Sequence, residues 1–442
     1  MLESAKLKTG LKKALATGEK IDGIGIDTWG VDIVFISPDG KIIAPPHHYR
    51  DPRTDNIRPW TFERVSAEDI YARTGIQFMN FNTVFQLSAS IRDQEQALKD
   101  AGKILFMPDA LTYLFCGSMA AEYSIASTSQ LLDAEARDWS WPIIDALGLK
   151  RDLFPPIAPS CSVAAPLTEA IQKELGCGPI PVIRVGAHDT ASAVASVPAD
   201  PSTSWAYLSS GTWSLLGVEL EHPLINDAAL KANYTNEGGL GGRIRFLCNI
   251  MGLWLIQECR NQWKREGREF SFGQLAEMAA SAEPFRSLVN PDDPSFMTPG
   301  DMPARFIEFC RKTGQPLPDT PARAARTAFE SLALRYRQAW NGLETLIGRK
   351  LDVLHLVGGG SKNALLNQFT ANAINGKVVT GPVEATAMGN IVGQAIALGD
   401  IPDLDTARAI VHRSDDETGC FEPKDIALWD QAYAKYLDIV GK

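Results

Sequence analysis

Short apolar runs alternate with amphipathic segments of helical spacing along most of the chain. Residues 21–30 form one apolar run, and 181–185 form another that leads into a small-residue helix from about residue 190. Between these runs the apolar positions recur with a helical period around 84–100, 108–116, 139–147 and 167–175. Strands that alternate with helices in this way predict an α/β fold.

Local signals mark several ends of these elements. Ser66 precedes "AEDIYART", and Gly75 follows it, which predicts a helix capped at both ends. The amphipathic N-terminal segment is predicted to end as a helix at Gly18. "VDIVFISPDGKII" predicts a hairpin that turns at Pro38-Asp39-Gly40.

The second half begins after "SVPADPSTS" at 196–204, a small, polar, proline-containing stretch that is typical of a domain boundary. Because 442 residues exceed what one hydrophobic core usually serves, two domains are expected, at 1–197 and 198–442. The second has a strand–turn–strand unit through Gly211-Thr212. Its further predicted elements are a long helix at 321–347, a strand ending in "VGGG", a helix at 362–375 and a helix from about Glu384.

The two halves resemble one another. In each, a helix leads into an apolar strand that ends in a glycine-containing loop, at 11–30 and again at 330–360. Only the second half has a hairpin, at 205–218, before its helices. If the halves are related units, the first lacks its opening strands.

Composition narrows the functional classes. The chain is 45% hydrophobic and 22% charged, with a net charge of −10 and no basic block, which argues against nucleic acid or a membrane surface as the main partner. Its seven cysteines are dispersed without a C-x-x-C pair, which favours free thiols in a reducing cytoplasm. Six histidines without paired spacing argue against a dedicated zinc site.

The turn "VGAHDTASAV" places Asp189 between a strand and a helix, where ligands gather in α/β sheets. Asp189 could act as a general base toward a substrate hydroxyl, or it could simply cap the helix. From spacing alone the capping role is favoured. His188 alone favours a buried, hydrogen-bonded imidazole.

Two glycine turns suit phosphate or nucleotide. "LSSGTWS" at 208–214 presents small hydroxyl residues and backbone amides, although an ordinary hairpin turn explains it equally well. "LVGGGSKNALL" opens onto a helix N-terminus, which attracts anions. "GIDTWGVD" could offer polar groups and an indole to a sugar, or be only a strand exit. Asn249 and Gln257 lie near and on a later apolar helix.

The order of several blocks resembles that of the FGGY carbohydrate kinases, over nearly the whole chain. These blocks are "IGIDTWGVD", "HYRDPRTD", "RTGIQFMNFNTVFQL", "MPDALTYLFCG", "HDTASAV", "YLSSGTWSLLG", "TNEGG", "NIMGLWLIQ", "VGGGSKNALLNQ" and "GPVEATAMGNI". The resemblance implies two ribonuclease H-like domains of the actin-like ATPase superfamily, with the active site in a cleft. It implies transfer of phosphate from ATP, with Mg²⁺, to the 1-hydroxyl of L-rhamnulose by a cytoplasmic enzyme, monomeric or homodimeric. L-fuculose and D-xylulose are the alternative sugars.

Residue roles also follow from the resemblance. It implies that Asp189 is the base, which reverses the weighting from spacing alone. The same resemblance places four residues at the sugar: Gly30 in the first domain, His188, Thr190 and Asn249. It places Thr212, Gln257, Gly359 and Asn363 at the nucleotide, on the side of the second domain.

One departure bears on activity. Members of the family open with a strand and a "D-I-G-A-S-S-G-R"-like loop that holds phosphates and the metal, and this sequence has no such segment. We therefore expect the first domain to lack its opening strands, and we assign no metal ligand. A start placed too late in the reading frame is the favoured explanation, and a fragment that binds sugar or nucleotide without phosphate transfer is the alternative.

Overall fold

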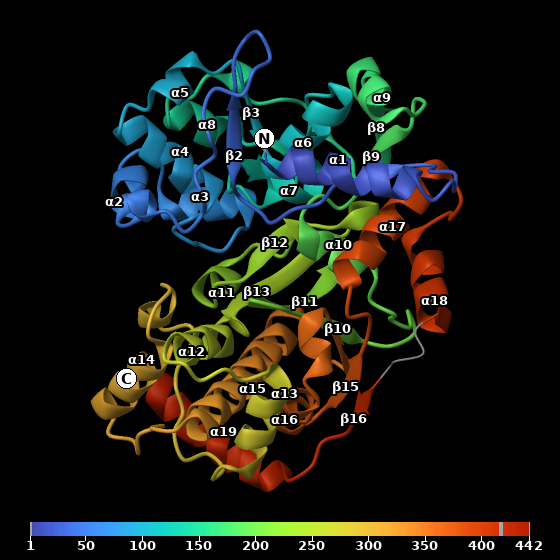
Figure 1. Cartoon of the computed structure of the whole chain (residues 1–442). Coiled ribbons are helices and arrows are strands. Elements are labelled where there is room, and N and C mark those ends of the chain that lie inside the picture. Colours follow the sequence, from blue (N-terminus) through green and yellow to red (C-terminus); the bar gives the residue numbers. More distant parts are fainter. Residues whose placement is uncertain (1, 415–418, 442) are drawn as a thin grey trace. The chain divides into compact units, whose positions relative to one another are not determined.

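The structure is a computed structural model that describes residues 2–414 and 419–441 (Figure 1). Its backbone divides into two compact units. The first comprises Met1–Ser196, Glu219–Phe246 and Thr386–Arg408, and the second comprises Val197–Val218, Leu247–Ala385 and Ala409–Lys442. The chain therefore returns to the first unit twice after leaving it at Ser196, and residues far apart in the sequence can share a site there.

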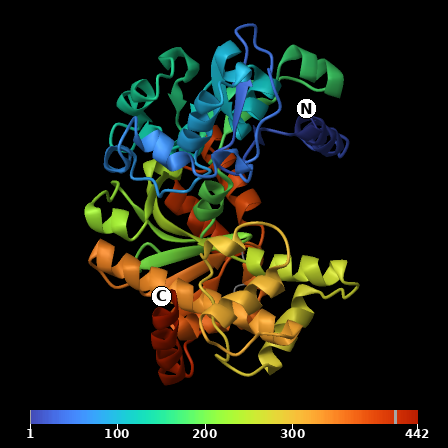
Figure 2. The same ribbon diagram turned by 90° about the vertical axis from the view of Figure 1, so that its left-hand side faces the viewer.

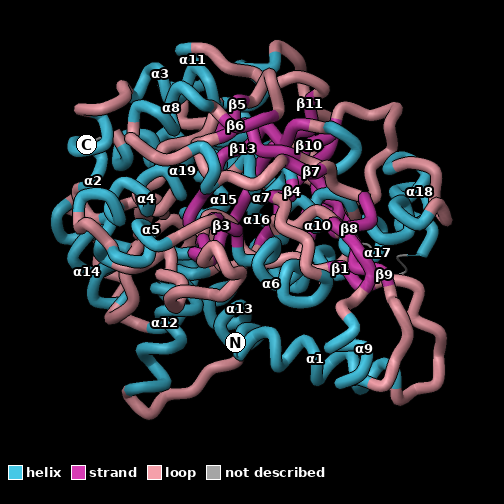
Figure 3. Tube along the Cα trace, turned by 90° about the horizontal axis from the view of Figure 1, so that it is seen from above, coloured by secondary structure: helices cyan, strands magenta, loops and turns pink. Residues whose placement is uncertain are grey.

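The sheet whose strand β9 leads to Asp189 lies in the first unit and has the order β1-β9-β8, which Figure 3 shows side by side. Strand β1 (Ile24–Gly25) runs parallel to β9 (Pro181–Arg184), and β8 (Ser162–Pro166) runs antiparallel to β9. The predicted apolar run at 21–30 thus contributes only a two-residue strand. Parallel pairing brings the carboxyl ends of β1 and β9 to the same edge.

The predicted hairpin is confirmed at its turn and in a short antiparallel pairing beside it, where Ile43 N–H donates to the Phe35 carbonyl at 3.0 Å. Gly40 has a left-handed φ of 83°, and its N–H donates to the Ser37 carbonyl. Beyond one bridge to Ile42, however, strand β2 (Ile33–Ile36) pairs antiparallel with β3 (Lys103–Phe106). All four residues of β2 are buried, and the segment after the turn pairs only briefly because it runs into Pro45-Pro46, which have no N–H to donate to a strand ladder.

The helix at 66–75 forms as predicted, as α3 (Ala67–Thr74) with Ser66 as N-cap and Gly75 as left-handed C-cap. The pattern at 84–100 is instead two helices, because Gln94 between them has a φ of 52°, which a continuous helix does not tolerate. The first unit also contains two small strand pairs, β4 (Ala121–Glu122) with β7 (Ile157–Ala158), and β5 (Leu132–Asp133) with β6 (Asp138–Trp139). Its other helices include α1 (Leu2–Leu15), α2 (Ile57–Phe62), α4 (Thr83–Arg92), α5 (Gln96–Asp100), α6 (Met107–Cys116), α7 (Tyr123–Ser127), α8 (Trp141–Ala146), α9 (Glu169–Leu175), α10 (Asp189–Ala195) and α11 (Asp227–Lys231).

Helix α1 lies at the periphery of the first unit (Figure 2). Its Leu11 and Leu15 pack against a core cluster that includes Ile26, Phe115 and Val182. A larger cluster fills the unit between β2, β3 and helices α2, α4, α7 and α8. Burial of apolar area in these clusters stabilises the strands from which the site loops emerge.

A seven-stranded sheet has the order β12-β13-β11-β10-β14-β15-β16. The predicted strand–turn–strand unit is confirmed as β10 and β11, which pair antiparallel, and β10 pairs parallel with β14. Strands β11 and β13 each contribute residues to both units. The bounds are β10 (Trp205–Ser210), β11 (Trp213–Leu220), β12 (Thr235–Gly238), β13 (Ile244–Met251), β14 (Val353–Val357), β15 (Lys377–Thr380) and β16 (Cys420–Phe421).

The long helix predicted at 321–347 is α15 (Pro321–Ile347), with Thr320 as N-cap, proline in its first turn and left-handed Gly348 after it. It packs between α13 and α16. No helix in the described part of the chain is long and apolar enough to cross a membrane. The remaining helices are α12 (Trp254–Arg265), α13 (Phe272–Ser281), α14 (Met302–Lys312), α16 (Ala364–Ile374), α17 (Ala385–Leu398), α18 (Leu404–Ser414) and α19 (Ile426–Val440).

Candidate functional site

The loops that follow β1 and β9 are joined by backbone hydrogen bonds. Thr28 N–H donates to the Ala187 carbonyl at 2.9 Å, and Asp189 N–H donates to the Thr28 carbonyl at 2.8 Å. These bonds extend the parallel pairing past the strand ends. Gly30 and the His188–Asp189 pair, 158 positions apart in the sequence, are therefore brought to one edge of the sheet.

Asp189 is the first residue of α10, and its side chain is 44% exposed. The capping role is wrong, because His188 and not Asp189 occupies the N-cap position, and the His188 side chain makes no capping hydrogen bond. The Asp189 carboxylate accepts a hydrogen bond from the Thr190 hydroxyl at 3.2 Å, and its Oδ1 lies 3.5 Å from His188 Nε2. Three predicted site residues thus lie together, with an accessible carboxylate among them.

Gly30 leaves the space beside His188 open. A Cβ atom added at Gly30 would lie 3.3 Å from His188 Nε2 and 3.4 Å from the Thr128 hydroxyl, at the limit of normal contact. A larger side chain would therefore displace the ring or fill the space next to Asp189. This close approach explains why glycine suits the position.

A buried glutamate that the sequence reasoning missed holds the loop before Asp189. Glu122 is 1% exposed, and its Oε2 accepts hydrogen bonds from Ala187 N–H at 3.2 Å and from the Ser124 hydroxyl at 2.6 Å. Ser124 Oγ in turn accepts from His188 N–H at 3.2 Å. Glu122 also accepts from Ile125 N–H as the N-cap of α7, and glutamate is not one of the residues that usually signal an N-cap, so no local pattern marked it.

A second missed group is a buried ion pair behind His188. Arg245 is completely buried, and its Nη2 lies 3.0 Å from Glu237 Oε2 and 3.1 Å from His188 Nδ1. The Arg245 Nε–H also donates to the Gly238 carbonyl at 2.9 Å. Both residues come from the segment 219–246 that returns to the first unit, so no local pattern relates them to His188.

Asp32 orients the indole of Trp29. Trp29 Nε1–H donates to Asp32 Oδ2 at 2.8 Å, and Gln86 Nε2–H donates to Oδ1 at 3.0 Å. Burial raises the pKa of Asp32, and these two hydrogen bonds oppose that rise. Because Trp29 is 38% exposed, Asp32 presents an aromatic surface close to Gly30.

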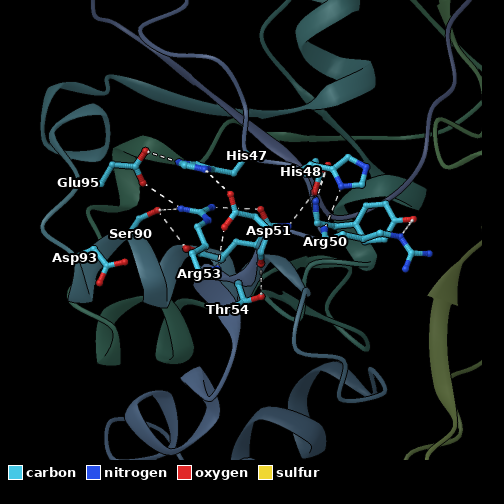
Figure 4. Close-up of polar contacts among 12 residues, drawn as sticks. His47, His48, Arg50, Asp51, Arg53, Thr54, Ser90, Asp93 and Glu95 are labelled. Atoms are coloured by element: carbon cyan, nitrogen blue, oxygen red, sulfur yellow. Dashed lines mark hydrogen bonds and ion pairs between the residues drawn. The ribbon is translucent and has the colours of Figure 1, made fainter. Parts of the chain in front are cut away.

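The segment "HYRDPRTD" is anchored by a set of charged contacts (Figure 4). The Arg53 guanidinium contacts Glu95 at 3.2 Å and donates to Ser90 at 3.0 Å. His47 Nε2 faces the other oxygen of Glu95 at 3.2 Å. Tyr49 N–H donates to Asp32 Oδ2 at 3.3 Å. The anchored segment therefore binds the same carboxylate that accepts from the Trp29 indole.

A third missed contact joins Asp27 to α17, where the Asn390 side-chain amide donates to the Asp27 carboxylate. Burial raises the pKa of Asp27 to about 6; the Asn390 hydrogen bond opposes the rise, and the charge of Asp189 adds to it. Helix α17 lies so close to α10 that a Cβ at Gly389 would be 1.6 Å from the Ser192 carbonyl oxygen. Thr386 also donates to the Asp189 carbonyl at 3.3 Å.

The predicted nucleotide residues lie in the second unit. Thr212 Oγ1 donates to Gln257 Oε1 at 3.3 Å, so the β10–β11 turn and α12 present one polar pair. Leu253 N–H donates to the Gly211 carbonyl at 3.0 Å, which ties the helix start to the turn. These contacts place two residues that are 45 positions apart beside each other.

The triple-glycine loop follows β14 and packs on β10. A Cβ at Gly360 would lie 2.0 Å from Ser210 Oγ, whereas Gly359 has nothing within 4 Å and is exposed. Asn363 Oδ1 accepts from Leu366 N–H at 3.1 Å as the N-cap of α16. Asn249, predicted to contact the sugar, lies on β13 in the second unit, whereas the other predicted sugar residues lie in the first.

Comparison with known families covers both halves of the chain. Residues 4–196 match the N-terminal domain of the FGGY family of carbohydrate kinases, and residues 206–398 match its C-terminal domain. The chain is 47% identical over 431 residues to the rhamnulokinase of Bacteroides thetaiotaomicron, which covers 98% of this chain and 88% of that protein. It is 42% identical over 414 residues to the rhamnulokinase of Enterobacter sp. (strain 638), covering 92% and 81%.

Solved structures show the same fold at low sequence identity. The ligand-bound xylulose kinase of Lactobacillus acidophilus superposes with a TM-score of 0.81 at 16% identity, covering 99% of this chain and 89% of that one. The glycerol kinase of Plasmodium falciparum with ADP gives 0.75 at 16% identity, covering 99% and 87%. The predicted α/β fold of two domains of the actin-like ATPase kind is thereby confirmed.

Proposed function

Because the chain belongs to the FGGY family of carbohydrate kinases, we propose that it transfers the γ-phosphoryl group of ATP to the 1-hydroxyl of L-rhamnulose. The relatives named rhamnulokinase, identical at up to 47% of positions, favour this sugar over L-fuculose and D-xylulose.

Asp189 is the general base in this proposal. The observation that carries the assignment is its accessible carboxylate at the carboxyl end of β9, free of a capping role and held beside His188 by backbone hydrogen bonds to Thr28. The carboxylate takes the proton as the hydroxyl oxygen attacks the γ-phosphorus, and ADP leaves. Phosphoryl transfer depends mainly on positioning and charge stabilisation, so one aligned base and a rigid frame are the protein's main requirements.

The other assignments divide between sugar and nucleotide. The sugar is proposed to contact three residues of the first unit, Gly30, His188 and Thr190. Asn249 on β13 is proposed to contact it as well. The sugar side, predicted at 1–197, also draws on Glu237, Arg245 and Asn390, since 219–246 and 386–408 fold with it. The nucleotide is proposed to bind at Thr212, Gln257, Gly359 and Asn363, on the predicted side of 198–442.

Mg²⁺ enters this proposal with ATP, as MgATP. Among the described residues, no group of three or more His, Cys, Asp or Glu side chains could hold a metal ion. Magnesium does not need one, because it keeps several waters and is bound largely through substrate phosphates. We assign no protein ligand to it. The dispersed free thiols support a cytoplasmic enzyme, which we expect to be a monomer or a homodimer.

The test measures ADP release by the full chain with MgATP and L-rhamnulose, L-fuculose or D-xylulose. We expect turnover that prefers L-rhamnulose, and a loss of about 10²–10⁴-fold in kcat for Asp189→Asn, the range for a positioned proton transfer. Preference for another sugar would overturn the substrate assignment. Turnover of Asp189→Asn within a few-fold of the unaltered protein would overturn the assignment of Asp189 as the base. Sugar binding without any turnover would overturn the assignment of kinase activity.

A further inference from the structure

We propose that Arg245 and Glu237 are positioning residues that place the proton of the His188 imidazole on Nε2, so that the ring donates a hydrogen bond to a sugar oxygen beside Asp189. The identity of the ligand rests on the proposed function. The position of the proton does not, because it can be measured without turnover.

The direction of one hydrogen bond carries the argument. Arg245 Nη2 lies 3.1 Å from His188 Nδ1 in hydrogen-bonding geometry. A guanidinium has only donors, so in this contact Nδ1 is the acceptor and carries no proton. A neutral imidazole has one N–H and one acceptor nitrogen, and its proton is therefore on Nε2. Protonating the ring fully would break the contact with Arg245.

The contacts of Arg245 fix the orientation of its guanidinium, so that Nη2 stays directed at His188 Nδ1. Its Nε–H donates to the Gly238 carbonyl, and Gly238 N–H in turn donates to the Ser127 hydroxyl at 2.7 Å. The fully buried guanidinium requires a compensating charge, which Glu237 supplies at 3.0 Å while itself only 5% exposed. The role of Glu237 is thus to compensate the buried charge of Arg245 and to hold the guanidinium in place.

The opposite nitrogen of His188 faces the candidate sugar position. Nε2 is 3.5 Å from Asp189 Oδ1, longer than the 2.7–3.2 Å typical of an N–H···O hydrogen bond. Gly30 leaves the neighbouring space without a side chain. An Nε2–H in this position can donate to a ligand oxygen while Asp189 accepts from the adjacent hydroxyl, and the two contacts together orient the sugar.

A competing arrangement is available in the same cluster. Glu237 Oε2 lies 3.3 Å from His188 Nδ1, so a proton on Nδ1 could be donated to this carboxylate. Nε2 would then be an acceptor facing the sugar, and Arg245 could not donate to Nδ1. The two arrangements predict opposite protons on the ring, which makes them distinguishable.

Nitrogen NMR of the full chain with ¹⁵N-labelled histidine tests the proton position directly, and loss of signals in His188→Gln assigns the ring among the six histidines. We expect an acceptor-type Nδ1 and a protonated Nε2 in the unaltered protein at neutral pH. A protonated Nδ1, or a ring protonated on both nitrogens, would overturn the proposal. This measurement needs no variant of Arg245 and no turnover.

A matched pair of arginine variants tests what causes the preference. Arg245→Gln should remove it, so that both ring forms are populated. Arg408→Gln is the control, because Arg408 is also buried and paired at 2.8 Å with a glutamate, Glu219, whose side chain is 7% exposed, and its described contacts are with Glu219 and the Val194 carbonyl, not with His188. A change of the His188 signals in the Arg408 variant as large as in the Arg245 variant would refute the role of Arg245.

Kinetics provide the second readout. The amide of glutamine reaches the position of Nε2, whereas that of asparagine reaches Nδ1. We expect His188→Gln to keep kcat/KM for L-rhamnulose within roughly 10-fold, and His188→Asn to lose about 100-fold or more, with KM for ATP unchanged. Equal losses would contradict an Nε2 donor. Absence of turnover in the unaltered protein would instead defeat the proposed function, and the NMR result would stand apart from it.

Discussion

The side-chain amide of Asn390 donates a hydrogen bond to the carboxylate of Asp27, although 363 positions separate the two residues. Asp27 follows β1, and Asn390 lies on α17, in the last segment of chain that returns to the first unit. Asp27 is close enough to Asp189 for the second carboxylate to raise its pKa. The contact therefore ties the C-terminal part of the chain to the edge of the sheet that carries the candidate base.

The raised pKa of Asp27 predicts a pH-dependent stability. Burial raises this pKa from an ordinary 3.8 to about 6, so the folded state binds the proton more tightly than the unfolded state. The resulting stabilisation is present in acid and is lost as the pH rises from about 4 to about 6. Between pH 4.5 and 7, Asp27 should reduce the free energy of unfolding by about 2 kcal/mol.

Urea unfolding of the unaltered protein and of Asp27→Asn at both pH values measures this contribution. The variant should lack the loss of about 2 kcal/mol that Asp27 causes between pH 4.5 and 7. Burial also raises the pKa of Glu330, to about 7, but Glu330 is present in both proteins and cancels in the comparison. An equal difference between the two proteins at both pH values would show that Asp27 does not titrate in this range.

Gly389 allows α17 to lie against α10. Because a Cβ there would be 1.6 Å from the Ser192 carbonyl oxygen, Gly389→Ala must push the helices apart. We expect a loss of about 1–3 kcal/mol in stability, together with lower kcat through displacement of Asp189 at the start of α10. Gly10→Ala in α1 is the control: nothing lies within 4 Å, and alanine should stabilise the helix by about 0.5–1 kcal/mol. Thermal unfolding and ADP release distinguish the two, and a Gly389 variant that behaves like the Gly10 variant would contradict the close packing.

Two neighbouring glycines test the nucleotide assignment. Gly359 is exposed with open space around it, so Gly359→Ala should leave stability within about 0.5 kcal/mol and the KM for sugar unchanged. If the nucleotide lies against this backbone, the KM for ATP should rise by roughly 10-fold. Gly360→Ala should instead destabilise the second unit by about 1–3 kcal/mol, since its Cβ would meet Ser210. An unchanged KM for ATP in the Gly359 variant would remove that residue from the nucleotide site.

The ion pair of Arg408 and Glu219 offers a double-mutant cycle. Both residues are buried, and Arg408 Nη2–H also donates to the Val194 carbonyl at 3.0 Å, in α10. Replacing Glu219 alone by leucine leaves a buried positive charge and should cost about 3–5 kcal/mol. The double variant with Arg408→Met should cost less than Glu219→Leu alone, because no unpaired charge remains. Additive losses in urea unfolding would show that the two residues are not coupled.

Much of the local structure follows from patterns of a few residues. Ser66 and Gly75 bound α3, Thr320 and Pro321 begin α15, and the strands around Gly211-Thr212 form the predicted hairpin. These features depend on hydrogen bonds and dihedral angles within one or two turns of chain, which the residue types themselves favour. The prediction failed at Gln94, where a left-handed residue with no sequence signal divides one helical pattern into two helices.

The sequence by itself determined the fold class, the order of elements and the turn that presents His188 and Asp189, because each depends on neighbouring residues or on long blocks that resemble a known family. Only the tertiary structure decided which side chains surround that turn. Four of these side chains lie between 49 and 201 positions along the sequence from His188 or Asp189, on segments with no shared pattern: Glu122, Glu237, Arg245 and Asn390. Their contacts arise from packing of the first unit, where burial of polar groups is stable only when distant donors and acceptors meet.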